Sequence, residues 1–256
     1  MTKISSILTN DVDLKLKKLK QSKDYFLKMS NVWQKELKVL SDLYSFWLEF
    51  PESRRDLIGG NNKREILKKA RKGYDNIRSA WQILSTHEKS LAEEFDQDLL
   101  LNVGRNVDPE NKAYRNARVS LNLKTYTPPN HIKIPNLVES LKKTLMNSSL
   151  DRTHPLETAI YMHLKLVGIQ PFFDGNKRVA RLFQDRVLYE NGLPPAIIHP
   201  GEREAYVGLL ENALAGDQDE DTKKQREFFD YVGGKVNSAL DDILKDLKLP
   251  LKYKLK

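Results

Sequence analysis

Apolar residues recur every three or four positions along most of this 256-residue chain, and this spacing predicts an all-α protein. Two helices are expected within residues 11–49, and the turn "LIGGNN" at 57–62 separates them from a longer helix. Ser90 and Glu93 form a capping-box pattern that opens another helix, which we expect to reach residue 101. Later helices are predicted at 135–146, 155–169, 175–190, 202–215 and 222–246.

Two segments depart from the usual amphipathic pattern. Residues 155–169 are apolar on most faces, which is typical of a helix at the buried centre of a bundle. The segment "ARVSLNLKTY" at 117–126 has β-favouring Val119, Thr125 and Tyr126 around alternating apolar residues, and we expect it to form a small hairpin. The pattern therefore predicts a helical bundle that carries one small β-element.

Composition narrows the possible partners only slightly. The formal net charge of +8 fits nucleic acid, nucleotide phosphates, an anionic membrane or an acidic protein. The lysines are spaced as on solvated helix faces and no nucleic-acid-binding pattern is present, so nucleic acid is not expected as a partner. No segment predicts a membrane span, so no membrane association is expected.

The chain has no cysteine, which excludes disulfides, thiolate nucleophiles and cysteine metal sites. This absence fits a cytoplasmic protein. Secretion as an effector stays open, because a secretion signal without hydrophobic character would leave no trace in this pattern.

The stretch "GIQPFFDGNKRVARLF" at 168–183 gathers the candidate chemistry where a loop turns into a helix. A helix N-terminus offers unpaired N–H groups, and Gly175 lets the backbone approach an anion closely. Arg178 and Arg181 present guanidinium groups that match phosphate oxygens. Asp174 would hold a divalent cation on those phosphates. From these residues alone, an ordinary helix start with Asp174 as its N-cap remains an alternative.

The segment "QPFFDGNKRVAR" resembles the signature of the Fic (Fido) family, HPFx(D/E)GN(G/K)RxxR. The likeness continues upstream through "HPLETA" and downstream through "PPAIIHPGEREAYVGLLENALAGD". It implies an all-α Fic-type domain with a hairpin flap, in which most members transfer AMP from ATP to a hydroxyl group of a target protein. We therefore divide the chain into an N-terminal helical extension (1–54), a Fic-like domain (55–240) and a basic C-terminal tail (241–256).

The resemblance also implies roles for residues at matching positions. Asp174 would bind Mg²⁺, and Gly175 and Asn176 would form an anion hole for the phosphates of ATP. The flap at 117–126 would dock an extended segment of the target protein by strand-like pairing.

Further roles fall on the cations of the motif. Arg178 and Arg181 would contact the phosphates, and Lys177 would lie in the same nucleotide cradle. The commonest AMP-transferring relatives have Gly at the position of Lys177. Lys at this position also occurs in the Doc branch, which transfers a phosphoryl group, so both nucleotide orientations stay open.

Gln170 stands where the family has its catalytic histidine. An amide cannot take a proton from the target hydroxyl, and losing a general base typically costs ~10²–10⁴-fold in rate. His163 lies about two helical turns from Gln170, or ~10 Å, which is too far for direct proton transfer. We expect His163 to be a packed core residue and His154 a helix-start residue, while nothing local argues for a role of His199.

Many relatives carry a self-inhibitory helix with a Ser/Thr-x-x-x-Glu-Gly/Asn motif. Its Glu pairs with the second motif arginine and blocks productive ATP binding. Aligning "LIGGN" at 57–61 with this motif puts Gly59 at the Glu position and Arg55 at the Ser/Thr position. This alignment predicts a vestige that cannot inhibit and that leaves Arg181 free. A plain turn between helices is the alternative.

Two main hypotheses follow. In the first, the chain is a Fic-type enzyme that binds ATP and Mg²⁺ and transfers AMP slowly because of Gln170. In the second, it is a nucleotide-binding pseudoenzyme that acts through protein interaction, with the helices at 11–49 contacting partners.

Overall fold

The computed structural model describes residues 4–21, 38–50, 63–86, 88–120, 125–150, 153–218 and 222–247. Almost all regular structure in these ranges is α-helical. The helices of the first half are α1 (Ser6–Lys20), α3 (Lys38–Glu49), α5 (Lys63–Ser85), α6 (Leu91–Glu94) and α7 (Gln97–Val107). Those of the second half are α8 (Ile134–Leu150), α9 (Pro155–Ile169), α10 (Asn176–Glu190), α11 (Arg203–Gln218) and α12 (Thr222–Asp246), with short 3₁₀ turns η2 (His131–Lys133) and η3 (Pro200–Glu202).

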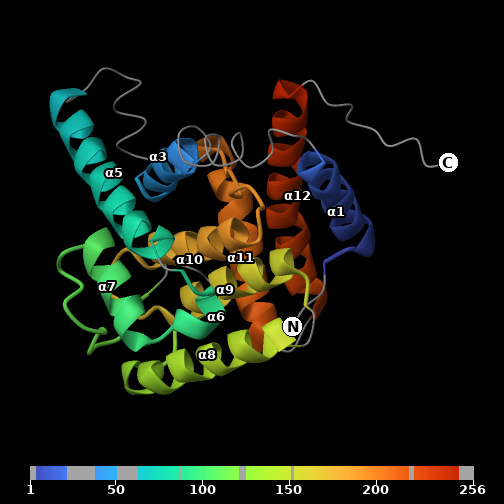
Figure 1. Cartoon of the computed structure of the whole chain (residues 1–256). Coiled ribbons are helices and arrows are strands. Elements are labelled where there is room, and N and C mark those ends of the chain that lie inside the picture. The colour runs from blue at the N-terminus through green and yellow to red at the C-terminus, as the bar shows by residue number, and fades with distance from the viewer. Residues whose placement is uncertain are drawn as a thin grey trace.

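The antiparallel pair α9 and α10 forms the centre of the molecule, as Figure 1 shows. Both helices are buried along most of their length, which agrees with the apolar character predicted for 155–169. His154 caps the start of α9, since its Nδ1 accepts a hydrogen bond from the backbone N–H of Leu156 at 3.2 Å. The loop between these central helices is the motif segment, which we define as residues 170–181.

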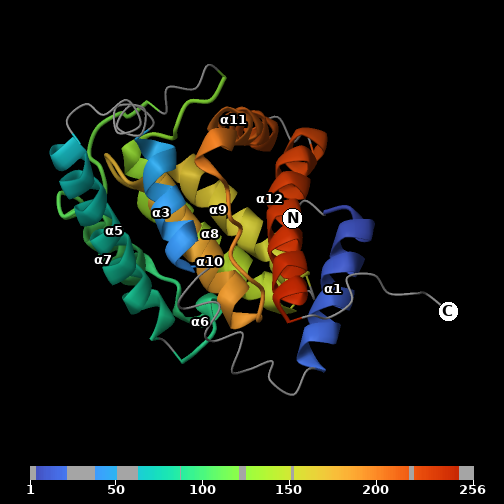
Figure 2. The same ribbon diagram turned by 90° about the horizontal axis from the view of Figure 1, so that it is seen from above.

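The other helices surround this pair on all sides. In Figure 2, α5 and α7 lie on one side of α9 and α10, and α12 and α1 lie on the other. The short helix α3 lies across α10 and also contacts α5 and η3. Buried residues of α1 and α3 join the same hydrophobic core as the central helices. Helix α12 continues past the domain boundary predicted at residue 240, and Ile243 and Leu244 are buried.

Two predicted elements differ from the structure. The helix expected from residue 90 to 101 is divided into α6 and α7, because Phe95 is buried in an extended conformation and Asp96 caps α7. The capping box of Ser90 and Glu93 is confirmed at the start of α6. The hairpin predicted at 117–126 is not seen: residues 117–120 and 125–126 form no strand, and 121–124 lie outside the described residues.

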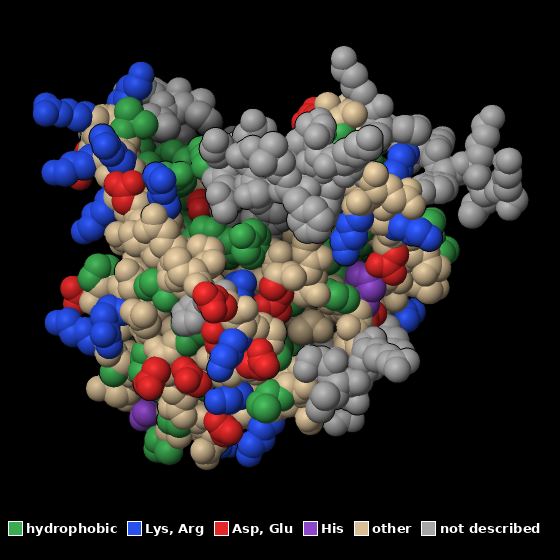
Figure 3. Space-filling model, viewed as in Figure 1, with side chains coloured by type: hydrophobic (Ala, Val, Ile, Leu, Met, Phe, Trp, Pro, Cys, Tyr) green, Lys and Arg blue, Asp and Glu red, His purple; other side chains and the backbone are tan. Residues whose placement is uncertain are grey.

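The positive charge gathers on the outer surface of α5, where Figure 3 shows lysine and arginine side chains at the upper left. The exposed cations of this helix are Lys63, Arg64, Lys68, Lys69, Arg71, Lys72 and Arg78. Their spacing is that of a solvated helix face. Within the described ranges, every helix is too short or too polar to span a membrane.

Candidate nucleotide site

The motif segment begins with a residue in a left-handed conformation. Gln170 ends α9 with φ 48° and ψ 64°, and no other non-glycine residue has positive φ in the described part of the chain. Its buried side chain donates from Nε2 to the Val167 carbonyl at 2.9 Å and accepts from Asn176 Nδ2 at 3.0 Å. Left-handed backbone costs a non-glycine residue ~1–2 kcal/mol. Both ends of the Gln170 amide are therefore used to hold the loop.

Arg115 supports this conformation from outside the motif. Its buried guanidinium donates to the carbonyls of Gln170 (2.6 Å), Ala117 (2.8 Å) and Pro129 (2.6 Å). The Arg115 backbone N–H also donates to the Pro171 carbonyl at 2.9 Å. Arg115 thus ties both ends of the segment 117–129, which contains the predicted flap, to the start of the motif segment.

The loop is anchored from beneath by Phe172 and closed by Asn176. Phe172 is fully buried, and its ring lies so close to Gly104 that a Cβ there would approach within 2.2 Å. Asn176 Oδ1 accepts from the Phe172 backbone N–H at 2.8 Å, and Nδ2 donates to the Phe172 carbonyl at 2.8 Å. Because the Asn176 side chain is engaged within the loop, only its backbone N–H is available to an anion.

Asp174 and Gly175 form the turn into α10. Gly175 has φ 79°, and its backbone N–H bonds Asp174 Oδ1 at 2.6 Å. The Asp174 side chain is 71% exposed, and its Oδ2 lies 3.4 Å from Arg178 Nη2. No cluster of three or more His, Asp or Glu side chains exists among the described residues. Mg²⁺ on nucleotides usually takes one or two carboxylates plus phosphate oxygens, so Asp174 fits a metal that is held jointly with phosphates.

Arg178 has an unused donor. Its side chain is 6% exposed, and its Nε is buried without a hydrogen-bond partner among the residues that the structure describes. Its guanidinium carbon lies 5.7 Å from the centre of the Phe50 ring. Buried polar groups are normally satisfied, so an unpaired guanidinium nitrogen is consistent with an anion site.

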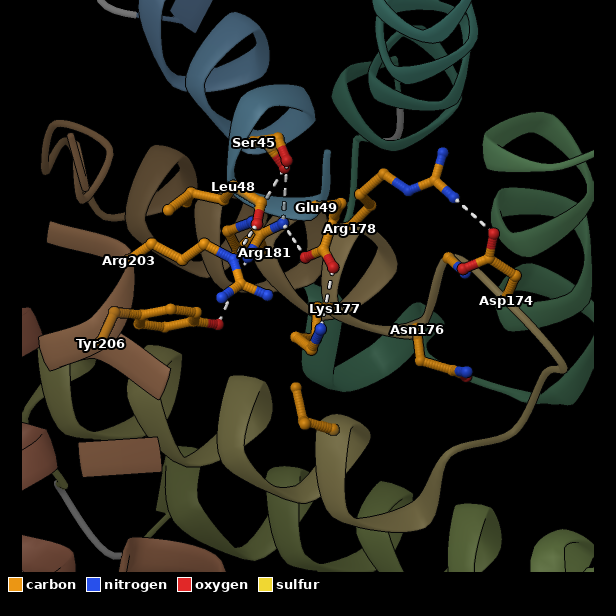
Figure 4. Close-up of polar contacts among 12 residues, drawn as sticks. Ser45, Leu48, Glu49, Asp174, Asn176, Lys177, Arg178, Arg181, Arg203 and Tyr206 are labelled. Atoms are coloured by element: carbon orange, nitrogen blue, oxygen red, sulfur yellow. Dashed lines mark hydrogen bonds and ion pairs between the residues drawn. The ribbon is translucent and has the colours of Figure 1, made fainter. Parts of the chain in front are cut away.

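The end of α3 reaches into this site, as Figure 4 shows. Glu49 lies between two cations: its Oε1 accepts from Arg181 Nη2 at 2.8 Å, and its Oε2 accepts from Lys177 Nζ at 2.8 Å. Burial alone would raise the pKa of Glu49, but the charges and hydrogen bonds of Lys177 and Arg181 outweigh it and lower the pKa to about 2. The carboxylate is therefore ionised at neutral pH. We call this arrangement of Glu49, Lys177 and Arg181 the Glu49 bridge.

The Glu49 bridge overturns the prediction that Arg181 is free. Residues 51–62, which include Gly59 and Arg55, lie outside the described residues. The partner of Arg181 comes instead from α3, where Ser45 and Glu49 have the Ser-x-x-x-Glu spacing. Arg181 Nε donates to Ser45 Oγ at 2.8 Å, so both polar residues of the pattern contact the second motif arginine.

A buried network holds Arg181 from its other side. Arg181 Nη1 donates to the Tyr206 hydroxyl at 3.3 Å, and that hydroxyl lies 2.9 Å from His163 Nε2. His163 Nδ1 lies 2.8 Å from Gln184 Oε1. Burial and the charge of Arg181 lower the pKa of His163 to about 3, so the imidazole is neutral. His163 is thus a satisfied core residue, as expected, and supports Arg181 through Tyr206.

His199 supports α3 and not the motif segment. Its ring contacts Tyr44 of α3 with centroids 5.2 Å apart, and its Nδ1 accepts from the Gly201 backbone N–H at 3.0 Å. Close by, Arg203 donates to the Leu48 carbonyl at 2.9 Å. A cation at the C-terminal carbonyls of a helix is favourable to the helix dipole, so Arg203 stabilises the end of α3.

A pocket of about 190 Å³ opens over the motif segment. It is lined by Glu49, Ser120, Gln170, Phe173, Asp174, Gly175, Asn176 and Lys177. The pocket therefore brings together five of the predicted site residues and places the carboxylate of Glu49 on the same wall. Arg178 and Arg181 are not among its lining residues, and both are buried.

Sequence reasoning missed the residues that come from outside the motif segment: Ser45, Glu49, Phe50, Arg115 and Tyr206. Ser45 and Glu49 carried a readable signal, since "SFWLEF" has the Ser-x-x-x-Glu spacing at the end of the N-terminal helices. Phe50 follows that Glu, where the family pattern has Gly or Asn. The turn "LIGGN" ten residues later has the expected Gly and Asn and therefore gives a better apparent match to the pattern. No local signal singles out Arg115 or Tyr206.

Part of this chain is similar in sequence to known proteins. The model of the Fic/DOC family matches residues 79–188. A protein adenylyltransferase Fic of Drosophila persimilis is 36% identical over 92 residues, which are 36% of this chain and 18% of that protein. Its counterpart in Nematostella vectensis is 35% identical over 104 residues, or 41% of this chain and 24% of that protein. The matched part thus spans about a fifth of the length of these curated relatives.

Solved structures extend the likeness to nearly the whole chain. Fic-1 from C. elegans superposes with a TM-score of 0.70 at 20% identity, covering 94% of this chain and 72% of that one. A Fic domain containing signaling protein from Bacteroides thetaiotaomicron superposes with a TM-score of 0.73 at 18% identity, covering 96% and 100%. At these identities the likeness concerns the fold. Taken with the family match over residues 79–188, which include the motif segment, it shows that this chain carries a Fic/DOC-type domain.

Proposed function

We propose that this chain binds ATP with Mg²⁺ over the motif segment and is built to transfer AMP to a hydroxyl side chain of a target protein. The observation that supports this proposal is the Glu49 bridge, because a carboxylate already occupies a position between Lys177 and Arg181 that suits an oxyanion. The unpaired Nε of Arg178 adds a third donor nearby. The names of the matched relatives supply the reaction class.

In this proposal the residues of the motif segment divide the work. The backbone N–H groups at the start of α10 and the side chains of Lys177, Arg178 and Arg181 would bind the phosphates. Asp174 would hold Mg²⁺, which supplies positive charge to the phosphates when it is bound. The target segment would dock along 117–126, which Arg115 ties to the motif segment.

Two features of the chain would limit turnover. In the reaction the target hydroxyl oxygen bonds the α-phosphorus, pyrophosphate leaves with the electrons of the broken P–O bond, and the hydroxyl proton must be accepted. Gln170 cannot accept that proton, and its amide is already engaged with Val167 and Asn176. The negative charge of Glu49 would in addition repel phosphates from the cations that it occupies.

A second candidate is a nucleotide-binding protein that does not turn over. The buried bonds of Gln170 favour it, because they give this side chain a structural role that needs no chemistry. The two candidates share the ATP site and differ in whether any group replaces the missing base.

The test compares the wild type with Glu49→Ala, Glu49→Ala/Gln170→His and Glu49→Ala/Gln170→Asn. Both substitutions at 170 suit the left-handed backbone, since His and Asn adopt it more readily than most residues, but only His restores a base. Binding of ATP·Mg²⁺ is measured by calorimetry. Transfer to lysate proteins is measured with ATP labelled on the α-phosphate or on the γ-phosphate.

We expect Glu49→Ala to bind ATP more tightly than the wild type and the His-containing variant to transfer the α-label about 10²–10⁴-fold faster than the Asn-containing control. Transfer of the γ-label would instead indicate a phosphoryl transferase of the Doc type. Failure of every variant to bind ATP would refute the nucleotide site. Binding without transfer by the His variant would leave the non-catalytic candidate.

A further inference from the structure

Lys177 depends on Glu49 more than Arg181 does. Arg181 also bonds Ser45 and the Tyr206 hydroxyl, so it keeps partners when Glu49 is removed. For Lys177, Glu49 is the anionic partner found among the described residues. Lys177 lies in the first turn of α10, where the helix dipole already contributes positive charge. An ammonium group in that position is favoured only when an anion is next to it.

The Glu49–Lys177 pair is shielded enough from solvent to count energetically. The side chains are 17% and 22% exposed, and they join positions 128 residues apart in the chain. Fully exposed ion pairs contribute little, whereas partly buried ones are less screened by salt. Lys177 therefore adds a second cation to the contact that fixes the end of α3.

Phe50, the residue after Glu49, lies against Arg178, the third cation of the motif segment. Its ring lies 4.7 Å from that of Phe46, which is itself buried in the core. Its ring centre is 5.7 Å from the guanidinium carbon of Arg178 and 4.4 Å from Lys69 Nζ. A cation that lies over an aromatic face is attracted by the ring, and more strongly where it is desolvated. Glu49 and Phe50 together thus contact Lys177, Arg178 and Arg181.

We propose that Lys177 and Phe50 are two further parts of the contact that closes the nucleotide site. Lys177 holds Glu49 when no nucleotide is bound, and the same ammonium group binds the phosphates once Glu49 has left. Phe50 covers Arg178 and must move away with Glu49 before all three cations are available. This inference rests on the proposed ATP site, and it assigns to Lys177 two opposite effects on nucleotide affinity.

The opposite effects can be separated by a double-mutant cycle with Lys177→Met and Glu49→Ala, measured as the Kd for ATP·Mg²⁺. In the Glu49→Ala background, Lys177→Met should weaken ATP binding about tenfold, because a charged phosphate contact is lost. In the wild-type background the same change should weaken ATP binding much less, or strengthen it, because it also releases Glu49. An equal loss of affinity in both backgrounds overturns the proposal.

A readout without nucleotide checks the closed state. In the wild type, Lys177→Met should lower Tm by about 2–4 °C, and in the Glu49→Ala background it should leave Tm unchanged. Lys165→Met is the matched control, because Lys165 pairs with Asp217 at 2.6 Å with comparable exposure but does not line the nucleotide pocket. It should lower Tm in both backgrounds and leave the Kd for ATP unchanged.

Phe50 is tested in the Glu49→Ala background. Phe50→Leu keeps an apolar side chain but removes the aromatic face, so it should tighten ATP binding a further two- to fivefold, or about 0.5–1 kcal/mol. Phe50→Tyr keeps the face and should leave the Kd unchanged. If Leu and Tyr give the same Kd, Phe50 has no such role. Failure of Glu49→Ala itself to bind ATP would count against the proposed function and not only against this inference.

Discussion

The motif segment and the end of α3 meet at one site but are built in different ways. Residues 170–181 are contiguous in sequence. The side chains of Gln170 and Asn176 stabilise the loop by hydrogen bonds to each other and to nearby carbonyl groups. Ser45 and Glu49 reach the same site from positions 128 to 136 residues earlier in the chain. In the proposed site, the phosphate-binding residues therefore lie in one contiguous segment, and the contact that would close the site comes from a separate helix.

The largest expected effect lies on the motif side of this comparison. Phe172→Ala should lower the free energy of unfolding by about 3–5 kcal/mol, because it opens a cavity beneath the loop against Gly104. Glu49→Ala should lower it less, because Arg181 keeps its bonds to Ser45 and Tyr206. Urea unfolding measures both variants. Equal losses would contradict the view that α3 controls access without holding the loop together.

The same contrast explains how far the sequence could predict the molecule. The helical spacing of apolar residues predicted most of the helices. The apolar faces of 155–169 predicted that α9 is the central helix, because a helix without a polar face must be buried. The motif segment could be recognised because its residues are neighbours in sequence. The Glu49 bridge was not, since its ion pairs depend on how α3 packs across α10 and Phe50 interrupts the expected pattern. Arg115 donates to three backbone carbonyls. Every residue has a backbone carbonyl, so the sequence does not show which of them Arg115 contacts.

An intermediate effect concerns the network behind Arg181. The pKa of His163 is lowered from 6.5 to about 3 by burial and by Arg181, so the unfolded chain binds a proton that the folded chain does not bind between these values. Stability should therefore fall as pH drops below 6.5, by about 1.4 kcal/mol per pH unit and about 2–3 kcal/mol by pH 4.5. Glu49, with its pKa lowered to about 2, adds a loss in the same direction only below about pH 4.5.

Urea titrations at several pH values measure this dependence. His163→Gln is the comparison, because it removes the titrating group and keeps a side chain that can hydrogen-bond. The slope between pH 6.5 and 4.5 should flatten in this variant, whereas the loss below pH 4.5 should remain. An unchanged slope would show that another group carries the dependence.

The smallest expected effect on stability comes from Ser45 of α3, which contacts Arg181. Ser45→Ala removes the hydroxyl that accepts from Arg181 Nε at 2.8 Å and should cost about 1 kcal/mol of stability. Because it loosens the contact that closes the site, it should also tighten ATP binding a few-fold. Ser41→Ala is the matched control, since Ser41 lies one turn earlier on α3 and donates to Asp185 of α10 at 3.2 Å, away from the motif cations.

The two serine variants distinguish the effect of the Ser45–Arg181 hydrogen bond from the effect of α3 packing as a whole. If α3 controls access through its bonds to the motif cations, both variants lose similar stability but only Ser45→Ala changes the Kd for ATP. If both variants tighten ATP binding equally, access depends on how firmly α3 packs as a whole. Control would then be a property of the helix, and the Ser45 and Glu49 contacts would be one part of its packing.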